Sequence, residues 1–162
     1  MDDVYNGVRH FLVREAKLLD RKRYWDWYDT LAEDVRYRVP VGVTQDMTYR
    51  SSEESFLFDE DRSSLRARIE RMDGEYAWSE KPPSRTRRLV GNVYVVDREG
   101  NEATVESSLV LLRWKGEHIQ PRILSGERED RLRFDDGDVE LAERTFHLDQ
   151  HRIDLTPVSI IL

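Results

Sequence analysis

The chain has 162 residues, a length typical of one domain that buries a single core. Charged residues make up 36% and apolar residues 38%, which excludes a largely disordered chain, and no apolar run approaches the roughly 18 residues of a membrane-spanning helix. A net charge of −7 argues against general nucleic-acid binding, and the lack of cysteine excludes disulfides, thiolate zinc sites and cysteine-ligated iron–sulfur clusters within the chain.

The first part of the sequence predicts two helices and a strand. Apolar residues at helical spacing indicate an amphipathic helix over Val4–Leu19, and a helix of about two turns is expected over Tyr24–Leu31. Arginines alternate with apolar residues over Val35–Val39, which predicts a strand that Pro40 should end. The stretch Val41–Phe58 shows no period, so we expect a loop there.

A third helix is predicted after this loop. Asp59 or Asp61 can cap its amino terminus, and Gly74 lies near its end, where a left-handed cap residue is usual. The apolar stripe of this helix consists of Leu65, Ile69, Met72 and Tyr76.

The second half of the sequence predicts a run of strands. The candidates are Leu89–Val96, Ala103–Trp114, His118–Phe134 with a break at Gly126, and Val139–Leu148. The turns between them are short and contain glycine, so these strands should pair as antiparallel neighbours. Helices followed by a meander indicate an α+β domain, with three helices in the amino-terminal half packed on one face of a curved sheet. The apolar tail Pro157–Leu162 should dock on this sheet or on a partner.

The segment Trp78–Val96 combines stiffness with positive charge. Pro82 and Pro83 enforce an extended backbone, and a cluster of three arginines follows directly before the predicted strand. The segment is either a solvated basic loop or a rigid docking element.

The order helix, helix, strand, helix and meander resembles the cone-shaped nuclear-transport-factor-2-like (NTF2-like) and SnoaL-like fold. More specific segments resemble the β (small) subunit of aromatic ring-hydroxylating dioxygenases, and the resemblance spans nearly the whole chain as one domain over residues 1–162. Those segments are E-A-K-L-L-D (Glu15–Asp20), Trp27-Tyr28, Asp34, Y-R-V-P (Tyr37–Pro40), L-R-A-R-I (Leu65–Ile69), A-W-S-E-K-P-P-S-R-T-R-R (Ala77–Arg88), Asn92-Val93, G-E-R-E-D-R-L-R (Gly126–Arg133), Arg144 and Leu148-Asp149.

The resemblance implies a structural, non-catalytic subunit. Its expected partners are a large α subunit, which would carry a Rieske [2Fe-2S] cluster and a mononuclear Fe(II), and sister β subunits that form a homotrimer within an α3β3 complex. That complex would cis-dihydroxylate an aromatic ring in the breakdown of aromatic compounds. Because the amino terminus lacks the features of a signal peptide, we expect a cytoplasmic protein without nucleic-acid or membrane partners.

The histidines give little support for a metal site. A non-heme iron site needs two histidines and a carboxylate that converge, and the chain has only His10, His118, His147 and His151. His147 and His151 could approach each other with Asp149 or Asp154, but such residues more often lie on the surface. We expect no metal in this chain.

An enzyme of the same fold is the alternative interpretation. Asp34, Tyr37, Asp130 and His118 are candidates for acid–base chemistry at the mouth of the cone. An isomerase, dehydratase or cyclase would then use Asp34 and Tyr37, although pairing of Asp34 with Arg36 explains that residue equally well. A third hypothesis is a small ligand-binding dimer without catalytic chemistry.

The positive prediction concerns contacts with partner subunits, because Trp and Arg are enriched at interface hot spots. The candidates are Trp25, Trp27, Tyr28, Trp78, Pro82, Pro83, Arg85, Arg87, Arg88 and Trp114. For Trp27 and Trp114 the core and an interface are equally good interpretations. For Pro82–Arg88 an interface is favoured, because a proline-stiffened segment loses little entropy on docking.

Overall fold

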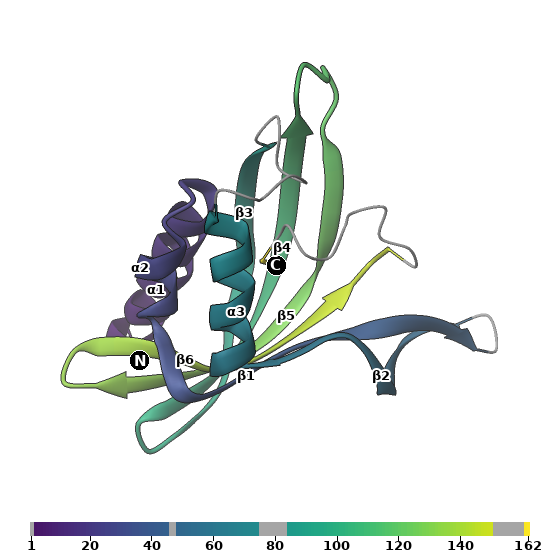
Figure 1. Cartoon of the computed structure of the whole chain (residues 1–162). Coiled ribbons are helices and arrows are strands. Elements are labelled where there is room, and N and C mark those ends of the chain that lie inside the picture. The colour runs from purple at the N-terminus through teal and green to yellow at the C-terminus, as the bar shows by residue number, and fades with distance from the viewer. Residues whose placement is uncertain (1, 46–47, 75–83, 151–160) are drawn as a thin grey trace.

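A computed structural model describes residues 2–45, 48–74, 84–150 and 161–162 of the chain (Figure 1). The helices are α1 (Asp2–Asp20), α2 (Tyr24–Tyr28) and α3 (Arg62–Asp73); the strands are β1 (Leu31–Gln45), β2 (Thr48–Asp61), β3 (Ser84–Glu99), β4 (Glu102–Lys115), β5 (Arg122–Asp135) and β6 (Asp138–Leu148). No helix within these ranges is both long and apolar enough to cross a membrane.

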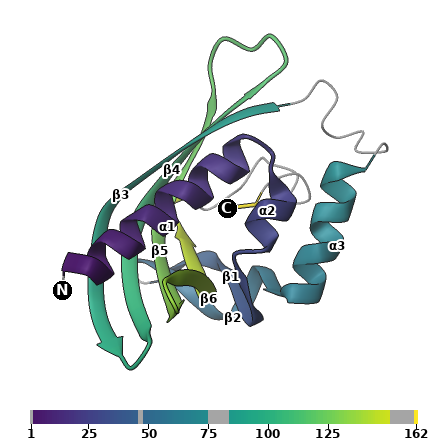
Figure 2. The ribbon, with the colours of Figure 1, turned by 90° about the vertical axis from the view of Figure 1, so that its left-hand side faces the viewer.

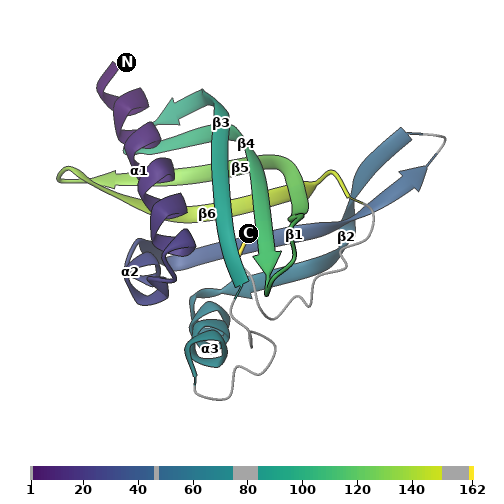
Figure 3. The same cartoon turned by 90° about the horizontal axis from the view of Figure 1, so that it is seen from above.

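The described strands form one curved, mixed sheet that does not close on itself. Their order is β2-β1-β6-β5-β4-β3, and every neighbouring pair is antiparallel except β1 and β6, which run parallel. The three helices lie on one side of this sheet, and α1 runs across β3 (Figures 1, 2 and 3). The predicted α+β class, with helices on one face of a mostly antiparallel sheet, is confirmed.

The core lies between the helices and the inner face of the sheet. On β4 and β5 buried residues alternate with more exposed ones, so every second side chain points toward the helices. Val8 and Leu12 of α1 belong to the same buried cluster as these inner side chains. Ile161 and Leu162 are buried in it as well, so the carboxyl-terminal end of the expected apolar tail docks on the chain's own core.

Helix α3 is capped by Asp61, one of the two predicted caps, and the cap is a capping box. The carboxylate of Asp61 accepts a hydrogen bond from the backbone N–H of Ser64, and the Ser64 hydroxyl pairs with the backbone N–H of Asp61. The prediction for the other end is wrong: Gly74 has φ −71° and ψ 153°, an extended rather than a left-handed conformation. Tyr76, expected to continue the apolar stripe, lies outside the described residues.

The predicted loop after Pro40 is wrong, because the chain forms a hairpin of β1 and β2. Strand β1 continues through Pro40 to Gln45, and its register with β2 shifts on both sides of the proline. A bulge accommodates proline because no ladder hydrogen bond from its nitrogen is needed there. The second helix is also shorter than predicted: it ends at Tyr28, and Leu31 begins β1.

The sheet is continuous at Gly126, so the predicted break in this strand is wrong. Gly126 pairs with Leu109 on β4 and with Leu148 on β6, and β5 begins at Arg122, which leaves His118 in the preceding turn. A Cβ atom at Gly126 would lie 2.2 Å from the backbone oxygen of His147. Glycine is therefore needed here for close approach of two backbones.

We expect Gly126→Ala to lower the free energy of unfolding by about 1–3 kcal/mol, because two strands must move apart to admit the methyl group. Gly91→Ala is the matched control, since a Cβ atom at Gly91 meets nothing within 4 Å. Urea denaturation of both variants checks this expectation. Equal stabilities of the two variants would contradict it.

Candidate functional site: a buried charge cluster in the cone

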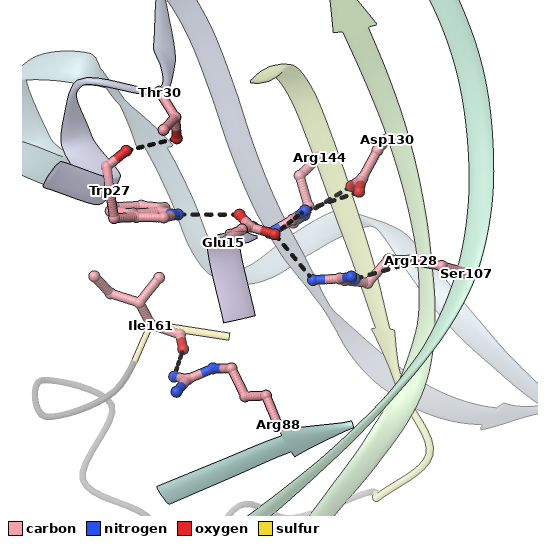
Figure 4. Close-up of polar contacts among 9 residues, drawn as sticks. All are labelled: Glu15, Trp27, Thr30, Arg88, Ser107, Arg128, Asp130, Arg144 and Ile161. Carbon is pink, nitrogen blue, oxygen red and sulfur yellow. Dashed lines mark hydrogen bonds and ion pairs between the residues drawn. The ribbon is translucent and has the colours of Figure 1, made fainter. Parts of the chain in front are cut away.

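The interior of the cone contains charged side chains from three elements. Glu15 comes from α1, Arg128 and Asp130 come from β5, and Arg144 comes from β6 (Figure 4). Each of the four is at most 2% exposed. Residues 128, 130 and 144 occupy inward positions of the alternating strands, and Glu15 lies on the face of α1 that covers them.

Arg144 is the centre of this cluster. Its Nη1 lies 2.7 Å from Oε1 of Glu15, and its Nη2 lies 2.9 Å from Oε2 of the same carboxylate. On the other side its Nε and Nη2 donate to the two carboxylate oxygens of Asp130 at 2.7 and 2.8 Å. One guanidinium group thus bridges two carboxylates with bidentate geometry, which is the strongest form of this ion pair.

Two other buried side chains also bind the carboxylate of Glu15. The indole N–H of Trp27 donates to its Oε1 at 3.0 Å, and Nη1 of Arg128 lies 3.4 Å from Oε2. The Nε of Arg128 donates in turn to Ser107 Oγ at 3.3 Å. Two carboxylates therefore face two guanidinium groups, and the cluster is close to electrically neutral.

The electrostatics of the cluster keep Glu15 ionised. Burial by itself would raise the pKa of this carboxyl, but attraction to Arg144 and Arg128 outweighs it and lowers the pKa to about 2. Burial likewise disfavours the Arg144 cation, yet Asp130 and Glu15 hold its pKa well above the usual value. A carboxylate in this state takes up no proton near neutral pH, so Glu15 is unsuited to acid–base catalysis.

The cavity that the described residues form beside Tyr37 is too small for a substrate. A cavity of about 10 Å³ is lined by Tyr37, Phe58 and Leu65 together with the docked Ile161 and Leu162. Ligand pockets usually measure roughly 300–1,000 Å³. Burial raises the pKa of the Tyr37 phenol, with Arg144 opposing the shift, so Tyr37 stays neutral at ordinary pH.

The enzyme hypothesis based on Asp34 and Tyr37 is wrong, because these residues lie on opposite faces of β1. The side chain of Asp34 is 64% exposed, whereas Tyr37 is buried at 3%. Asp34 accepts two hydrogen bonds from Arg133 at 2.9 and 3.1 Å, and this pairing lowers its pKa. Of the other two candidates, Asp130 lies near Tyr37 but is paired with Arg144, whose guanidinium carbon lies 5.6 Å from the Tyr37 ring centroid. His118 lies apart from them, in the turn after β4.

The histidines do not converge on a metal site in the part of the chain that is described. His10 lies on α1, His118 in a turn and His147 on β6, and no group of three or more potential metal ligands is found within the described ranges. His151 and Asp154 lie outside those ranges. A Rieske cluster does not fit this chain, because its ligands include two cysteines and the sequence has none.

The structure places the predicted contact residues in different environments. Trp27 is fully buried and Arg88 is buried against Asp20 and the carbonyl oxygen of Ile161, so both serve the chain's own core. Trp25 is 40% exposed and donates to Asp73 at 3.1 Å. Tyr28 is partly buried under Arg62, whose guanidinium carbon lies 4.4 Å from the ring centroid.

The remaining contact candidates fall into two groups. Arg85 and Arg87 are exposed on β3, which begins at Ser84 rather than at the predicted Leu89, and Trp114 is half-buried on β4 beside them. Trp78, Pro82 and Pro83 lie outside the described residues.

Reasoning from residue patterns alone missed the cluster around Arg144. Glu15, Arg128 and Asp130 all lie in segments that carry the family resemblance, as does Arg144 itself. Their presence in those segments was the sequence feature that could have pointed to them. Only the fold shows that the four side chains meet.

Comparison with known proteins identifies relatives of this chain. The sequence model described as "Ring hydroxylating beta subunit" matches residues 14–155. The chain is 37% identical over 154 residues to biphenyl 2,3-dioxygenase subunit beta of Rhodococcus jostii, which covers 90% of this chain and 82% of the relative. It is 35% identical over 159 residues to benzene 1,2-dioxygenase subunit beta of Pseudomonas putida, which covers 93% and 84%.

A solved structure shows the same fold. The structure of naphthalene 1,2-dioxygenase with indole bound in the active site contains a chain that matches with a TM-score of 0.83 at 20% identity, covering 95% of this chain and 83% of the other. The expected NTF2-like fold is confirmed by this likeness. Because the family match and both sequence relatives span most of its length, the chain belongs to the ring-hydroxylating β-subunit family.

Proposed function

We propose that this chain is the non-catalytic, cytoplasmic β subunit of the terminal oxygenase of an aromatic ring-hydroxylating dioxygenase. It stabilises an α3β3 complex in which the α subunits carry the Rieske cluster and the mononuclear iron. Those α subunits cis-dihydroxylate an aromatic ring in the breakdown of aromatic compounds. The present chain contributes shape and contact surface to this assembly.

The observation that carries the proposal is the buried charge cluster inside the cone. The place where an enzyme of this fold would hold a substrate is occupied by ion pairs between Glu15, Asp130, Arg128 and Arg144. The cavity that the described residues form beside Tyr37 measures about 10 Å³. Buried carboxylates that two guanidinium groups hold as ions are unsuited to acid–base chemistry, which supports a function on the surface.

The contact residues that we retain are those with accessible side chains. Trp25, Arg85 and Arg87 are exposed, and Trp114 is half-buried. The segment with Trp78, Pro82 and Pro83 stays a proposed contact, because its residue types suit an interface. Trp27 and Arg88 support these contacts indirectly, by fixing the core beneath them.

Co-expression with an α (large) subunit of a ring-hydroxylating dioxygenase tests the proposal. We expect the two chains to purify together with equal stoichiometry, all iron to remain with α, and ring dihydroxylation to need both chains plus electron donors. The chain purified alone should contain no iron and should oxidise no aromatic compound. Catalysis by the chain alone, or failure to bind α, would overturn the proposal.

A further inference from the structure

Ile161 and Leu162 lie inside the cone in the manner of a bound ligand. They are 3% and 4% exposed and belong to the buried core cluster, yet they are part of no helix or strand. In the part of the chain that is described, one hydrogen bond holds their backbone: Nη2 of Arg88 donates to the carbonyl oxygen of Ile161 (Figure 4). Residues of the sheet are held by whole ladders of backbone bonds. This internal segment, Ile161–Leu162, is therefore held mainly by burial of its two side chains.

Three different elements form the wall around the internal segment. Tyr37 comes from β1, Phe58 from β2 and Leu65 from α3, and together with the internal segment they line the cavity of about 10 Å³. Each of these three wall residues is at most 9% exposed. An apolar cavity of about 150 Å³ lined by such side chains binds a molecule as large as benzene. The space that Ile161 and Leu162 fill is thus suited to a small apolar ligand.

The hydroxyl of Tyr37 is a polar group of this wall without a partner. Its Oη makes no hydrogen bond to the described residues, and Arg144 faces the ring, with its guanidinium carbon 5.6 Å from the ring centroid. Glu60 and Arg68, which also line the cavity, form an ion pair with each other. Buried polar groups are nearly always hydrogen-bonded, so the unpaired hydroxyl marks a position that a polar atom of a ligand can satisfy.

The residues that fill the site indicate the chemistry of its ligand. Ile161 and Leu162 show that the space accepts branched aliphatic groups, and the Tyr37 hydroxyl adds one hydrogen-bonding position. A charged ligand would lose its hydration without gaining an unpaired counter-charge, because Glu60 and Arg68 already neutralise each other. A neutral molecule with a branched aliphatic body and a single oxygen matches both features.

We propose that the cone holds a binding site for small branched aliphatic molecules with one hydroxyl or carbonyl oxygen, and that Ile161 and Leu162 compete with the ligand for it. The oxygen of the ligand pairs with Tyr37, and its aliphatic part takes the place of the two side chains. Binding then requires displacement of the internal segment, which lowers the apparent affinity. This site does not depend on the assembly function proposed above.

Titration of the full-length chain with 3-methylbutan-1-ol tests the site, because this alcohol has the branched body of a leucine side chain and a single hydroxyl. Methyl NMR follows two signals: Leu65 reports entry of the alcohol, and Ile161 reports displacement of the internal segment. In wild type we expect both signals to shift with the same dissociation constant. This measurement uses the unaltered chain, so it does not depend on whether a variant folds.

Ile161→Ser with Leu162→Ser removes the internal competitor, because polar side chains are disfavoured in an apolar site. The dissociation constant of the alcohol should fall about 10- to 30-fold, since every molecule then has an open site. Ile119→Ser with Leu89→Ser is the matched control. It loses the same two residue types from positions that are 93% and 56% exposed, and it should bind the alcohol as wild type does.

Tyr37→Phe tests the polar contact, because it removes the unpaired hydroxyl and keeps the ring. Added to the Ile161→Ser, Leu162→Ser variant, it should weaken binding of the alcohol about 3- to 10-fold, the usual effect of losing one hydrogen bond. Unchanged affinity would mean that the ligand's oxygen does not pair with Tyr37, which contradicts the proposal.

Circular dichroism confirms that each variant is folded. Equal affinities of wild type and the Ile161→Ser, Leu162→Ser variant overturn the proposal, because the internal segment would then not compete. An Ile161 signal of wild type that stays unchanged at about 100 times the dissociation constant of that variant overturns it as well. If the chain assembles with an α subunit but binds no alcohol, the proposed function stands and the present inference is wrong.

Discussion

Replacing Arg144 with methionine is expected to lower the free energy of unfolding by about 3–5 kcal/mol. The substitution keeps much of the side-chain volume but leaves the carboxylates of Glu15 and Asp130 buried without their shared cation. Removal of one partner from a buried pair is costly because a buried charge is left uncompensated; here Asp130 loses its cation, and Glu15 keeps only Arg128, 3.4 Å away. Urea or guanidinium denaturation at pH 7 measures the loss.

Arg133→Met is the matched control for this prediction. Arg133 also binds a carboxylate with two hydrogen bonds, but its partner Asp34 is 64% exposed to solvent. Exposed ion pairs contribute about 0–1 kcal/mol, so this variant should remain close to wild type. If both variants lost the same free energy of unfolding, burial of the ion pairs would not explain how much the cluster contributes to stability.

Acid is expected to remove about 3 kcal/mol of stability between pH 5 and pH 2 through Glu15 alone. Folding lowers the pKa of this carboxyl from its ordinary 4.5 to about 2, and a difference of that size corresponds to about 3 kcal/mol. Below pH 4.5 the unfolded chain takes up a proton that the folded chain refuses, so stability falls as the pH falls. Above pH 4.5 the stabilisation that Glu15 provides is fully present.

Unfolding free energies of wild type and Glu15→Gln, measured in parallel from pH 2 to pH 7, check this expectation. The other carboxyl groups titrate in both proteins, so the difference between the two curves reports Glu15. We expect that difference to shrink by about 3 kcal/mol toward low pH. A difference independent of pH would mean that folding does not shift the pKa of Glu15.

Much of the architecture follows from local pattern. Strand β4 could be predicted because inward and outward residues alternate along it, and α3 could be located from Asp61 and an apolar stripe. Strand β5 was predicted with a break at Gly126 that the structure does not have. The hairpin of β1 and β2 could not, because Val41–Phe58 shows no alternation and a proline normally ends a strand. Pairing across a bulge at Pro40 depends on the neighbouring strand, which the local sequence does not describe.

The candidate site was less accessible to sequence reasoning. Asp34 and Tyr37 looked like a catalytic pair, yet they are three residues apart on one strand, and an odd separation places side chains on opposite faces. The two-residue alternation of side chains along a strand was therefore enough to exclude Asp34 and Tyr37 as a catalytic pair. Glu15 and Arg144 gave no such hint, because 129 residues separate them and only the assembled fold brings them within 2.7 Å.

That long separation constrains the order in which the protein can fold. Glu15 belongs to the first helix and Arg144 to the last strand, which also forms the parallel ladder with β1. A nascent chain that lacks β6 leaves the Glu15 carboxylate without its cation and β1 without one of its neighbours. Closure of such distant contacts is slow, and we therefore expect the native core to form only after nearly the whole polypeptide has left the ribosome.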